Sequence, residues 1–268
     1  MTIKLIAIDM DGTLLNPKHE LTEKVKKVIQ RVNNQGVNVI LATGRPFIGV
    51  EQYLHELALH QDNQYCITNN GSLIQNAKSG ECLFEVLLGF DDYLYFEELS
   101  RVLEVHFQAF TKTEMFTSNR DISKYTIHEA WMTGIPLRYC SVGDMDCNLT
   151  FPKVMMLDPP DRLDAAIARI PEKALQQYTI MKSSPYYLEI LDKRANKGAA
   201  LRFIAEMLGY ARSEIMAIGD QENDLAMLEY SGISIAMSNS ISRVKSVAKF
   251  ITKSNTEDGV ALAIERFA

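Results

Sequence analysis

An apolar run over residues 3–8, interrupted only by Lys4, leads directly into Asp9-Met10-Asp11-Gly12-Thr13. A continuous run rich in Ile and Leu is typical of a parallel strand buried on both faces, which an α/β architecture provides. Asp9 and Asp11 therefore follow the carboxyl end of a strand, the edge at which open α/β sheets bind ligands. Gly12 permits a sharp exit and leaves room beside Asp9 for an anionic group. The pattern predicts an α/β fold with a metal ion and a phosphate group at this edge.

Two other interpretations of this segment stay open. Asp and Gly are also ordinary turn residues, so the segment could simply end the strand. Asp9, Asp11 and Thr13 also occupy the first, third and fifth positions of a calcium loop, with Glu20 at the twelfth. A calcium loop requires glycine at the sixth position, which is Leu14 here, and a helix before it.

The composition is that of a globular protein long enough for one large domain or two smaller ones, with 268 residues. A net charge of −6 without a long basic run argues against nucleic acid as a partner. We expect no secretory signal, no membrane span and a cytoplasmic location. The four cysteines lack metal-ligand spacing and are expected to be free thiols.

The chain is expected to divide into a discontinuous core and an insertion. Residues 1–83 alternate strands with helices, and the strands predicted at 37–42 and 65–68 end at polar loops, as does the first. Residues 84–189 are richer in aromatic residues and carry shorter, alternating runs, which predict an antiparallel sheet with helices on one face. The α/β pattern returns in residues 190–268, with a helix at 197–208 and a strand at 215–218.

Asp220 and Asp224 follow the strand at 215–218, as Asp9 follows the first strand. Carboxylates in this number suit Mg²⁺, and no histidine is expected near them. Lys197 is predicted at a helix N-terminus, where a cation is unfavourable unless an anion is bound there. Thr43 and its neighbour Gly44 end the second strand and offer a hydroxyl and an amide to the same anion.

Four segments together resemble the motifs of the haloacid dehalogenase superfamily of phosphohydrolases, in the Cof-type subgroup with a type IIB cap. They are Asp9-Met10-Asp11-Gly12-Thr13, Thr43-Gly44-Arg45, Asn196-Lys197-Gly198 and Gly219-Asp220-Gln221-Glu222-Asn223-Asp224. The resemblance implies a Rossmann-like parallel sheet core with an inserted α+β cap that determines substrate specificity. It also implies an enzyme acting on small phosphorylated metabolites, with sugar phosphates as the expected class.

The resemblance also implies a role for each motif residue. Asp9 would be the nucleophile that forms an aspartyl-phosphate, and Asp11 the general acid and base. The ligands of Mg²⁺ would come from Asp9, Asp11 (through its backbone carbonyl), Asp220 and Asp224. Phosphate and substrate would be bound by Met10, Thr43, Gly44, Arg45, Asn70, Lys197 and Asn223.

Three alternatives remain at this point. Phosphomannomutases share the first motif and the cap type, and no motif residue separates hydrolysis from transfer between sugars. A receiver-like module would be phosphorylated at Asp9 without turnover. His55 and His60 resemble a zinc protease helix, but a five-residue spacing would direct them about 140° apart on a helix. In the insertion, Arg120, His128 and Lys182 are polar candidates for substrate contact.

Overall fold

A computed structural model describes residues 2–268 and divides the chain into two compact units. The first, called the core unit here, comprises the chain up to Gly44, Val50–Phe84 and Asn196–Ala268. The second, called the inserted unit, comprises Arg45–Gly49 and Glu85–Ala195.

The core unit is built on an eight-stranded sheet in the order β14-β13-β12-β1-β2-β3-β4-β5. The strands are β1 (Leu5–Ile8), β2 (Asn38–Ala42), β3 (Tyr65–Thr68), β4 (Leu73–Asn76), β5 (Cys82–Glu85), β12 (Ile215–Gly219), β13 (Ile233–Ala236) and β14 (Phe250–Ile251). All pairs from β14 to β3 are parallel, and β4 is antiparallel to β3. The predicted parallel α/β core is confirmed, and β4 and β5 add a short extension that the apolar pattern did not indicate.

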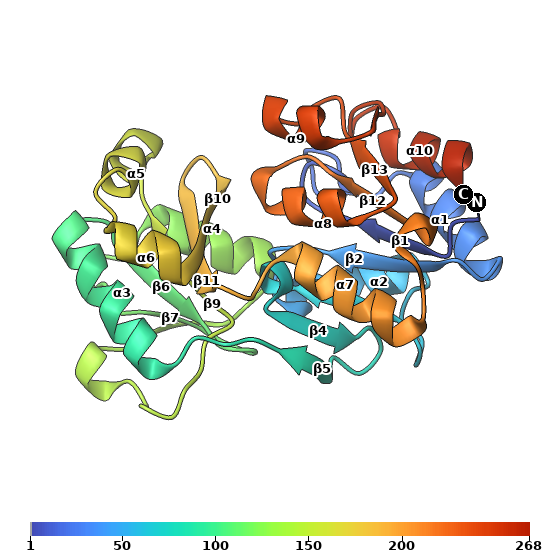
Figure 1. The fold of residues 1–268 in the computed structure, drawn as a ribbon. Helices are drawn as coiled ribbons and strands as arrows, with labels where there is room; N and C mark the ends of the chain where they lie inside the picture. The colour runs from blue at the N-terminus through green and yellow to red at the C-terminus, as the bar shows by residue number, and fades with distance from the viewer. Residues whose placement is uncertain (1) are drawn as a thin grey trace. The chain divides into compact units, whose positions relative to one another are not determined.

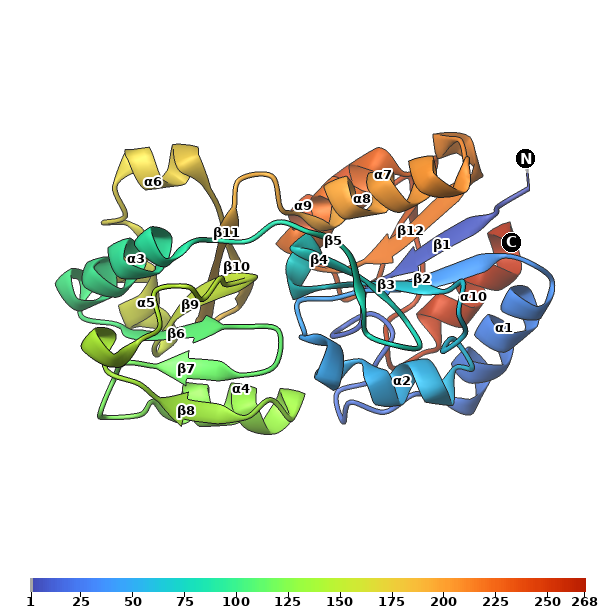
Figure 2. The same cartoon turned by 90° about the horizontal axis from the view of Figure 1, so that it is seen from below.

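Helices cover both faces of this sheet, α7 and α8 on one and α1, α2 and α10 on the other (Figures 1 and 2). They are α1 (Glu23–Asn34), α2 (Glu51–Glu56), α7 (Lys197–Leu208), α8 (Leu225–Tyr230), α9 (Ser242–Val247) and α10 (Gly259–Phe267). Helix α1 illustrates how the sequence specifies these helices. Thr22 caps its N-terminus, and its buried residues recur at helical spacing. Short 3₁₀ turns are η1 (Phe47–Gly49), η2 (Asn69–Gly71), η3 (Val142–Asp144), η4 (Arg212–Glu214) and η5 (Glu222–Asp224).

The inserted unit contains a six-stranded sheet in the order β10-β11-β9-β6-β7-β8. Its strands are β6 (His106–Phe110), β7 (Met115–Thr117), β8 (Leu137–Tyr139), β9 (Lys153–Leu157), β10 (Tyr178–Ser184) and β11 (Tyr187–Asp192). The pairs are antiparallel except β7 with β8, which is parallel. The expected antiparallel sheet is therefore present, with one parallel edge.

Helices lie on both faces of this sheet, so the expectation of helices on one face only was wrong. The helices are α3 (Phe90–Leu103), α4 (Lys124–Thr133), α5 (Pro160–Ile167) and α6 (Glu172–Gln177). Val154 and Met156 of β9 pack with α3, α5 and α6, while Met155 and Leu157 pack on the other face with Tyr125 of α4. Every residue of β9 is buried, because alternate side chains meet helices on opposite faces.

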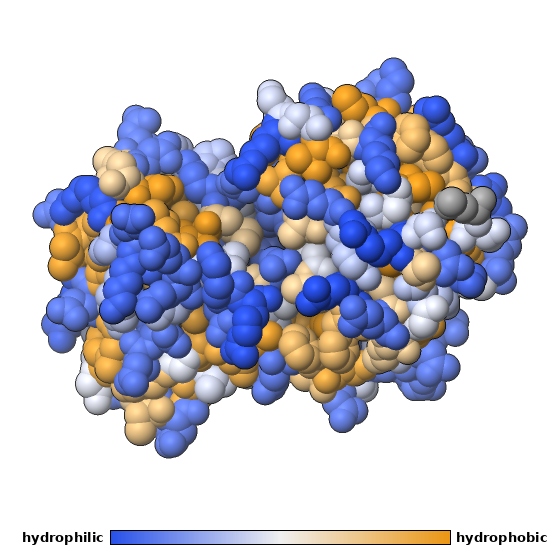
Figure 3. All heavy atoms as spheres, in the orientation of Figure 1, coloured by the Kyte–Doolittle hydropathy of each residue, from blue (hydrophilic) through white to orange (hydrophobic). Residues whose placement is uncertain are grey.

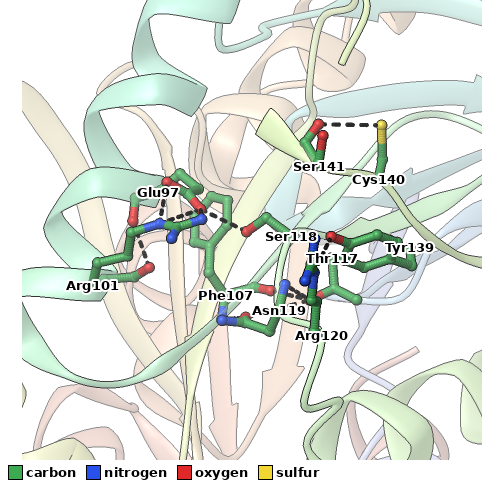
Figure 4. A network of polar contacts seen from close by, with 11 residues as sticks. Glu97, Arg101, Phe107, Thr117, Ser118, Asn119, Arg120, Tyr139, Cys140 and Ser141 are labelled. Carbon is green, nitrogen blue, oxygen red and sulfur yellow. Dashed lines mark hydrogen bonds and ion pairs between the residues drawn. The ribbon is translucent and has the colours of Figure 1, made fainter. Parts of the chain in front are cut away.

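Polar contacts connect α3 to the segment that follows β7 (Figure 4). Arg101 donates to both carboxylate oxygens of Glu97, and Ser118 donates to the same carboxylate at 2.7 Å. The side chain of Asn119 accepts from the backbone N–H of Phe107 at 2.8 Å. These bonds satisfy a buried carboxylate and fix the end of the β6–β7 hairpin.

A second buried ionic group lies on the α4 side of the inserted sheet. Nζ of Lys153 is 3.1 Å from Oε2 of Glu189, 3.8 Å from Oε1 of Glu129 and 4.6 Å from the ring centre of Phe110. All three ionic side chains are at least 95% buried. Such a group resists rearrangement, because breaking the pair leaves an uncompensated charge in the interior.

Within residues 2–268, no helix combines the length and apolar character needed to cross a membrane. On the face shown in Figure 3, hydrophilic residues surround separate apolar patches.

Candidate active site

The candidate site lies where four neighbouring parallel strands of the core unit end. β12, β1, β2 and β3 are consecutive in the sheet, and Asp220, Asp9, Thr43 and Asn69 follow them directly. The backbone N–H of Asp9 donates to Ile218, and that of Asn70 donates to Thr43. The strand ends predicted from sequence therefore meet along one edge of the sheet.

Lys197 joins two of the acidic residues. Its Nζ donates to Oδ1 of Asp9 at 2.6 Å and to Oδ1 of Asp224 at 2.7 Å. The lysine and Asp224 are fully buried, and Asp9 is 5% exposed. Residues 188 and 27 positions apart in the sequence thus share one charged contact, which only the sheet topology brings about.

The start of α7 holds Lys197 in place. The side chain of Asn196 caps the helix by accepting from the N–H of Ala199 at 2.8 Å. The turn η2 packs against this helix start so closely that a Cβ on Gly71 would lie 2.3 Å from the carbonyl oxygen of Asn196. Gly71 also has φ of +95°, so the turn requires glycine for both reasons.

Asp220 is fixed by the loop that contains the first motif. The hydroxyl of Thr13 donates to its Oδ1 at 2.8 Å. Gly12 has φ of +85°, and a Cβ there would lie 2.4 Å from Oδ2 of Asp220. From the sequence, Gly12 was expected to give access to Asp9, but its close neighbour in the structure is Asp220.

Asp224 has both carboxylate oxygens engaged. Its Oδ2 accepts from the backbone N–H groups of Asp220 at 2.8 Å and of Gln221 at 3.1 Å, while Oδ1 accepts from Lys197. The side chain therefore orients the loop and the lysine at once. These bonds give Asp224 a positioning role, in addition to the oxygen that it offers to the group of three carboxylates.

Burial and mutual repulsion raise the pKa values of the acids. Burial, followed by the charge of Asp224, raises the pKa of Asp9 well above its usual range despite the opposing effect of Lys197. Burial and Asp224 likewise raise the pKa of Asp220 to about 7. Burial by itself would lower the pKa of Lys197, but Asp224 and Asp9 raise it overall, so the lysine stays charged.

The donor set fits a divalent cation. Asp9, Asp220 and Asp224 each offer an oxygen within 4.8 Å of the others, and all three are buried. With the acids ionised, three carboxylates face one lysine and leave two negative charges uncompensated. Hard oxygen donors with this charge suit Mg²⁺. Among residues 2–268, no other group of three or more His, Cys, Asp or Glu side chains converges in this way.

Asp11 lies outside this carboxylate group and contacts a histidine. Its Oδ1 is 3.2 Å from Nδ1 of His19, and both side chains are about 40% exposed. The expectation that no histidine lies near the acids was therefore wrong for Asp11. His19 has φ of +59°, and its carbonyl accepts from the hydroxyl of Tyr53. No spacing rule connects residues 11 and 19, because a loop brings them together.

Asn69 and Asn70 of η2 and Asn223 of η5 belong to turns that both pack against α7. Nδ2 of Asn223 donates to Oδ1 of Asn70 at 2.9 Å, and Oδ1 of Asn223 has no hydrogen-bond partner within residues 2–268. Asn69 is fully buried, and its amide likewise has no partner in the described chain. Asn69 and Asn70 both have positive φ, at +47° and +54°. Strained backbone and unpaired buried amides commonly mark a ligand site, and Asn69 was not predicted.

The remaining predicted residues differ in their surroundings. Met10 is fully buried. Thr43 is buried and Gly44 half-buried at the end of β2. Arg45 belongs to the inserted unit, where its Nη1 donates to the carbonyl of Gly49 at 3.4 Å.

The structure also tests two alternative interpretations of the sequence, a calcium loop at the first motif and a zinc protease helix at His55 and His60. A strand precedes Asp9, which excludes the helix that a calcium loop needs. The expected 140° separation of His55 and His60 was wrong, because α2 ends at Glu56 and Ala58 has φ of +58°. The chain then turns back, and the two rings lie 4.2 Å apart.

Comparisons with known proteins all identify relatives that are hydrolases or phosphatases. A family model described as haloacid dehalogenase-like hydrolase matches residues 6–264. The chain is 46% identical to a Streptococcus pyogenes serotype M6 protein provisionally designated a phosphatase, over 100% of this chain and 99% of that protein. It is 31% identical to the Bacillus subtilis 5-amino-6-(5-phospho-D-ribitylamino)uracil phosphatase YcsE, over 99% and 96%. A crystal structure of a haloacid dehalogenase-like hydrolase from Bacteroides thetaiotaomicron is similar with a TM-score of 0.88, 30% identity and full coverage of both chains.

Proposed function

The chain belongs to the haloacid dehalogenase-like hydrolases, and we propose that it is a Mg²⁺-dependent phosphatase that hydrolyses small phosphomonoesters through an aspartyl-phosphate. The contact of Lys197 with Asp9 and Asp224, beside the buried Asp220, is the observation that carries this proposal. It combines a nucleophile, a fixed cation for phosphate and a donor set for a metal at one strand edge.

In the first step, a carboxylate oxygen of Asp9 attacks phosphorus, and the bond from phosphorus to the ester oxygen breaks. Asp11 donates a proton to the departing oxygen. In the second step, Asp11 takes a proton from water, the water oxygen attacks phosphorus, and the bond to Asp9 breaks to release phosphate. The exposure of Asp11 and its place outside the carboxylate group support a proton-transfer role.

Other residues of the site bind the phosphoryl group or hold its ligands. Lys197, the Thr43 hydroxyl and the Gly44 amide would bind phosphoryl oxygens, where negative charge develops. The backbone of Met10 and the side chains of Arg45 and Asn70 are further candidates, and Asn223 and Asp224 would orient the lysine. Asp9, Asp220 and the backbone carbonyl of Asp11 would hold Mg²⁺. The ion supplies charge that neutralises the carboxylates and polarises the phosphoryl group.

Sugar phosphates are the first substrate class to examine, because the motifs resemble those of the bacterial sugar phosphatase YidA. A second class to examine is phosphate esters that contain a uracil ring, because the chain is 31% identical in sequence to YcsE, which is named for such a substrate. Both classes are small phosphomonoesters that the same chemistry hydrolyses.

The test is phosphate release from a panel of sugar, nucleotide and cofactor phosphates with and without Mg²⁺. We expect Mg²⁺-dependent turnover that falls by at least about 10³-fold in Asp9→Asn and by roughly 10² to 10⁴-fold in Asp11→Asn. Asp62→Asn is the control, since Asp62 is an exposed partner of Lys78.

Two outcomes would replace the proposal. Labelling of Asp9 in a one-to-one ratio without turnover would indicate a receiver-like module. Transfer of phosphate from one sugar to another, without release, would indicate a mutase.

A further inference from the structure

Two asparagine side chains hold the loop that follows β1 from outside the group of carboxylates. Nδ2 of Asn239 donates to the backbone carbonyl of Gly12 at 2.8 Å. Nδ2 of Asn255 donates to the backbone carbonyl of Leu15, also at 2.8 Å. The first donor comes from the loop after β13 and the second from the segment between β14 and α10. Residues 227 and 240 positions apart in the sequence are therefore joined at this loop.

The two asparagines are also bonded to each other. The backbone N–H of Asn255 donates to Oδ1 of Asn239 at 3.2 Å. The Asn239 side chain therefore donates from its nitrogen and accepts at its oxygen, and these two bonds together define the orientation of its amide. A carboxylate only accepts, and an apolar side chain of similar size does neither, so the position requires an amide. We refer to Asn239 and Asn255 as the asparagine pair.

The loop that carries Asn239 also bonds to the end of β12. The backbone N–H of Ile241 donates to the carbonyl of Asp220 at 3.2 Å. The hydroxyl of Ser240 donates to the carbonyl of Gly219, also at 3.2 Å. This loop therefore contacts the Asp220 segment on one side and, through Asn239, the loop after β1 on the other. It spans the two segments that supply the proposed metal ligands.

The segment that carries Asn255 is itself closely held. A Cβ on Gly259 would lie 2.1 Å from the carbonyl oxygen of Lys253, so the turn before α10 closes only with glycine at this position. The hydroxyl of Thr22, the N-cap of α1, donates to Oδ1 of Asp258 at 2.6 Å. These contacts tie the segment to α1 and to the start of α10, so the Asn255 amide is held in place before any ligand binds.

The loop that the asparagine pair holds carries Asp11, whose backbone carbonyl is a proposed ligand of Mg²⁺. Gly12 follows Asp11 directly, and Asp11 forms a β-bridge with Leu15. The two hydrogen bonds from the asparagine pair therefore restrain the backbone on which that carbonyl depends. Asn239 is exposed and Asn255 half-buried, so their bonds contribute little to overall stability. Groups that orient a metal ligand have a larger effect on metal affinity.

We propose that Asn239 and Asn255 are positioning residues that set the affinity of the candidate site for Mg²⁺, by holding the loop of Asp11 beside the Asp220 segment. This inference rests on the proposed Mg²⁺ site of the phosphatase. Neither asparagine is assigned a contact with phosphate or with the reacting atoms. Loss of either one therefore changes how tightly the metal binds and leaves the chemical step intact once the metal is bound.

Calorimetric titration of the full chain with Mg²⁺ measures this affinity directly. We expect Asn239→Leu and Asn255→Leu each to raise the Kd for Mg²⁺ by roughly 10- to 100-fold. The double variant should raise it by much less than the product of the two single effects, because the asparagines are bonded to each other.

Asn76→Leu is the matched control for these variants. Nδ2 of Asn76 likewise donates to a backbone carbonyl of the core unit, that of Asp62. Asn76 pairs with Tyr65, the first residue of β3, and so lies at the opposite end of the strands from the candidate site. Its replacement should leave the Kd for Mg²⁺ unchanged.

Hydrogen exchange in EDTA examines the loop itself without metal. The backbone N–H groups of Leu14 and Leu15 donate to the carbonyls of Asp9 and Met10. These amides should exchange at least about tenfold faster in Asn239→Leu and Asn255→Leu, and at the unsubstituted rate in the control variant.

Phosphate-release assays distinguish positioning of the metal from a general loss of structure. In both single variants the Mg²⁺ concentration for half-maximal activity should rise by the same factor as the Kd, and saturating Mg²⁺ should restore kcat. An unchanged Kd, or a kcat that stays low at saturating Mg²⁺, would overturn the inference and leave the phosphatase standing. Absence of Mg²⁺ binding by the unsubstituted chain would reject the metal site and this inference with it. Mg²⁺ binding that weakens as expected, without hydrolysis of any ester, would support the positioning role and reject the phosphatase alone.

Discussion

Lys197 shows how much one side chain contributes to the candidate site. It is fully buried at the start of α7, a position that the helix dipole makes unfavourable for a cation, yet two carboxylates lie within 2.7 Å of its ammonium group. Its charge does not fully compensate the acids around it. The remaining negative charge makes single-residue changes here sensitive to pH and to metal.

His19 offers a residue-scale prediction about Asp11. Replacement of His19 by Ala removes its 3.2 Å contact with the Asp11 carboxylate. The carboxylate is then less well positioned for proton transfer. We expect kcat to fall by about tenfold with little change in KM. His55→Ala, at an exposed histidine on α2, should leave both constants unchanged, and equal effects of the two variants would show that the Asp11 contact is not used.

The raised pKa of Asp220 leads to a prediction about how the stability of the metal-free protein depends on pH. Its pKa rises from 3.8 to about 7 on folding, so between these values the folded chain binds a proton that the unfolded chain has lost. Its contribution to the free energy of unfolding therefore decreases by up to about 4 kcal/mol as the pH rises from about 4 to about 7. Above pH 7 this contribution is constant.

Urea denaturation in EDTA between pH 5 and pH 8 measures this slope. We expect Asp220→Asn to flatten it and saturating Mg²⁺ to raise stability most above pH 7, where the acids are ionised. Asp62→Asn serves as the exposed control. An unchanged slope in Asp220→Asn would contradict the assignment.

At the scale of elements, the turn η2 determines where α7 begins relative to β3. Gly71→Ala adds a Cβ where the carbonyl of Asn196 lies 2.3 Å away, and φ there is positive. We expect a loss of more than about 2 kcal/mol in the free energy of unfolding and a reduced kcat, because the start of α7 moves with Lys197.

Gly36→Ala is the matched control for this change. Gly36 has φ of +91°, but a Cβ added there would have no atom within 4 Å. It should cost about 1 kcal/mol from backbone strain alone and leave kcat unchanged. Denaturation and phosphate-release assays on both variants separate strain from displacement of the lysine.

In the inserted unit, Lys153 forms buried ion pairs with Glu189 and Glu129. Lys153→Met leaves two carboxylates buried near each other, so we expect a loss of about 3 to 5 kcal/mol in stability. The loss should be largest at neutral pH and smaller where the carboxylates are protonated. Lys112→Met, which removes an exposed partner of Glu85, should change stability little, and similar losses in both would contradict a special role for burial.

At the scale of the whole molecule, all the proposed metal ligands belong to the core unit, although three separate chain segments build that unit. Mg²⁺ at about 100 times its Kd should stabilise the unit that binds it by about 2.7 kcal/mol. Hydrogen exchange with and without Mg²⁺ should therefore show added protection in the core unit, concentrated around the first and last motifs. Protection confined to the inserted unit would place the metal elsewhere.

Local sequence was sufficient for the buried strands and for most of the motif positions. The runs at β1, β2 and β12 are apolar without alternation, and α7 has a cap, a periodic face and a terminal glycine, so their character is written in neighbouring residues. No separate prediction was made for α3 and α4, whose residues Phe96 and Tyr125 pack on a sheet that is formed by distant strands.

The sequence by itself determined that carboxylates and small polar residues follow strand ends and that a lysine begins a helix, because these positions obey short-range patterns of burial and turn chemistry. Only the tertiary structure decided which of them meet. Lys197 bonds to Asp9 and Asp224, Gly12 makes room for Asp220, His19 reaches Asp11, and Tyr186 stacks on Tyr125. The physical reason is that these contacts join segments whose separation depends on sheet order and loop geometry, and neither is encoded in the spacing of residues along the chain.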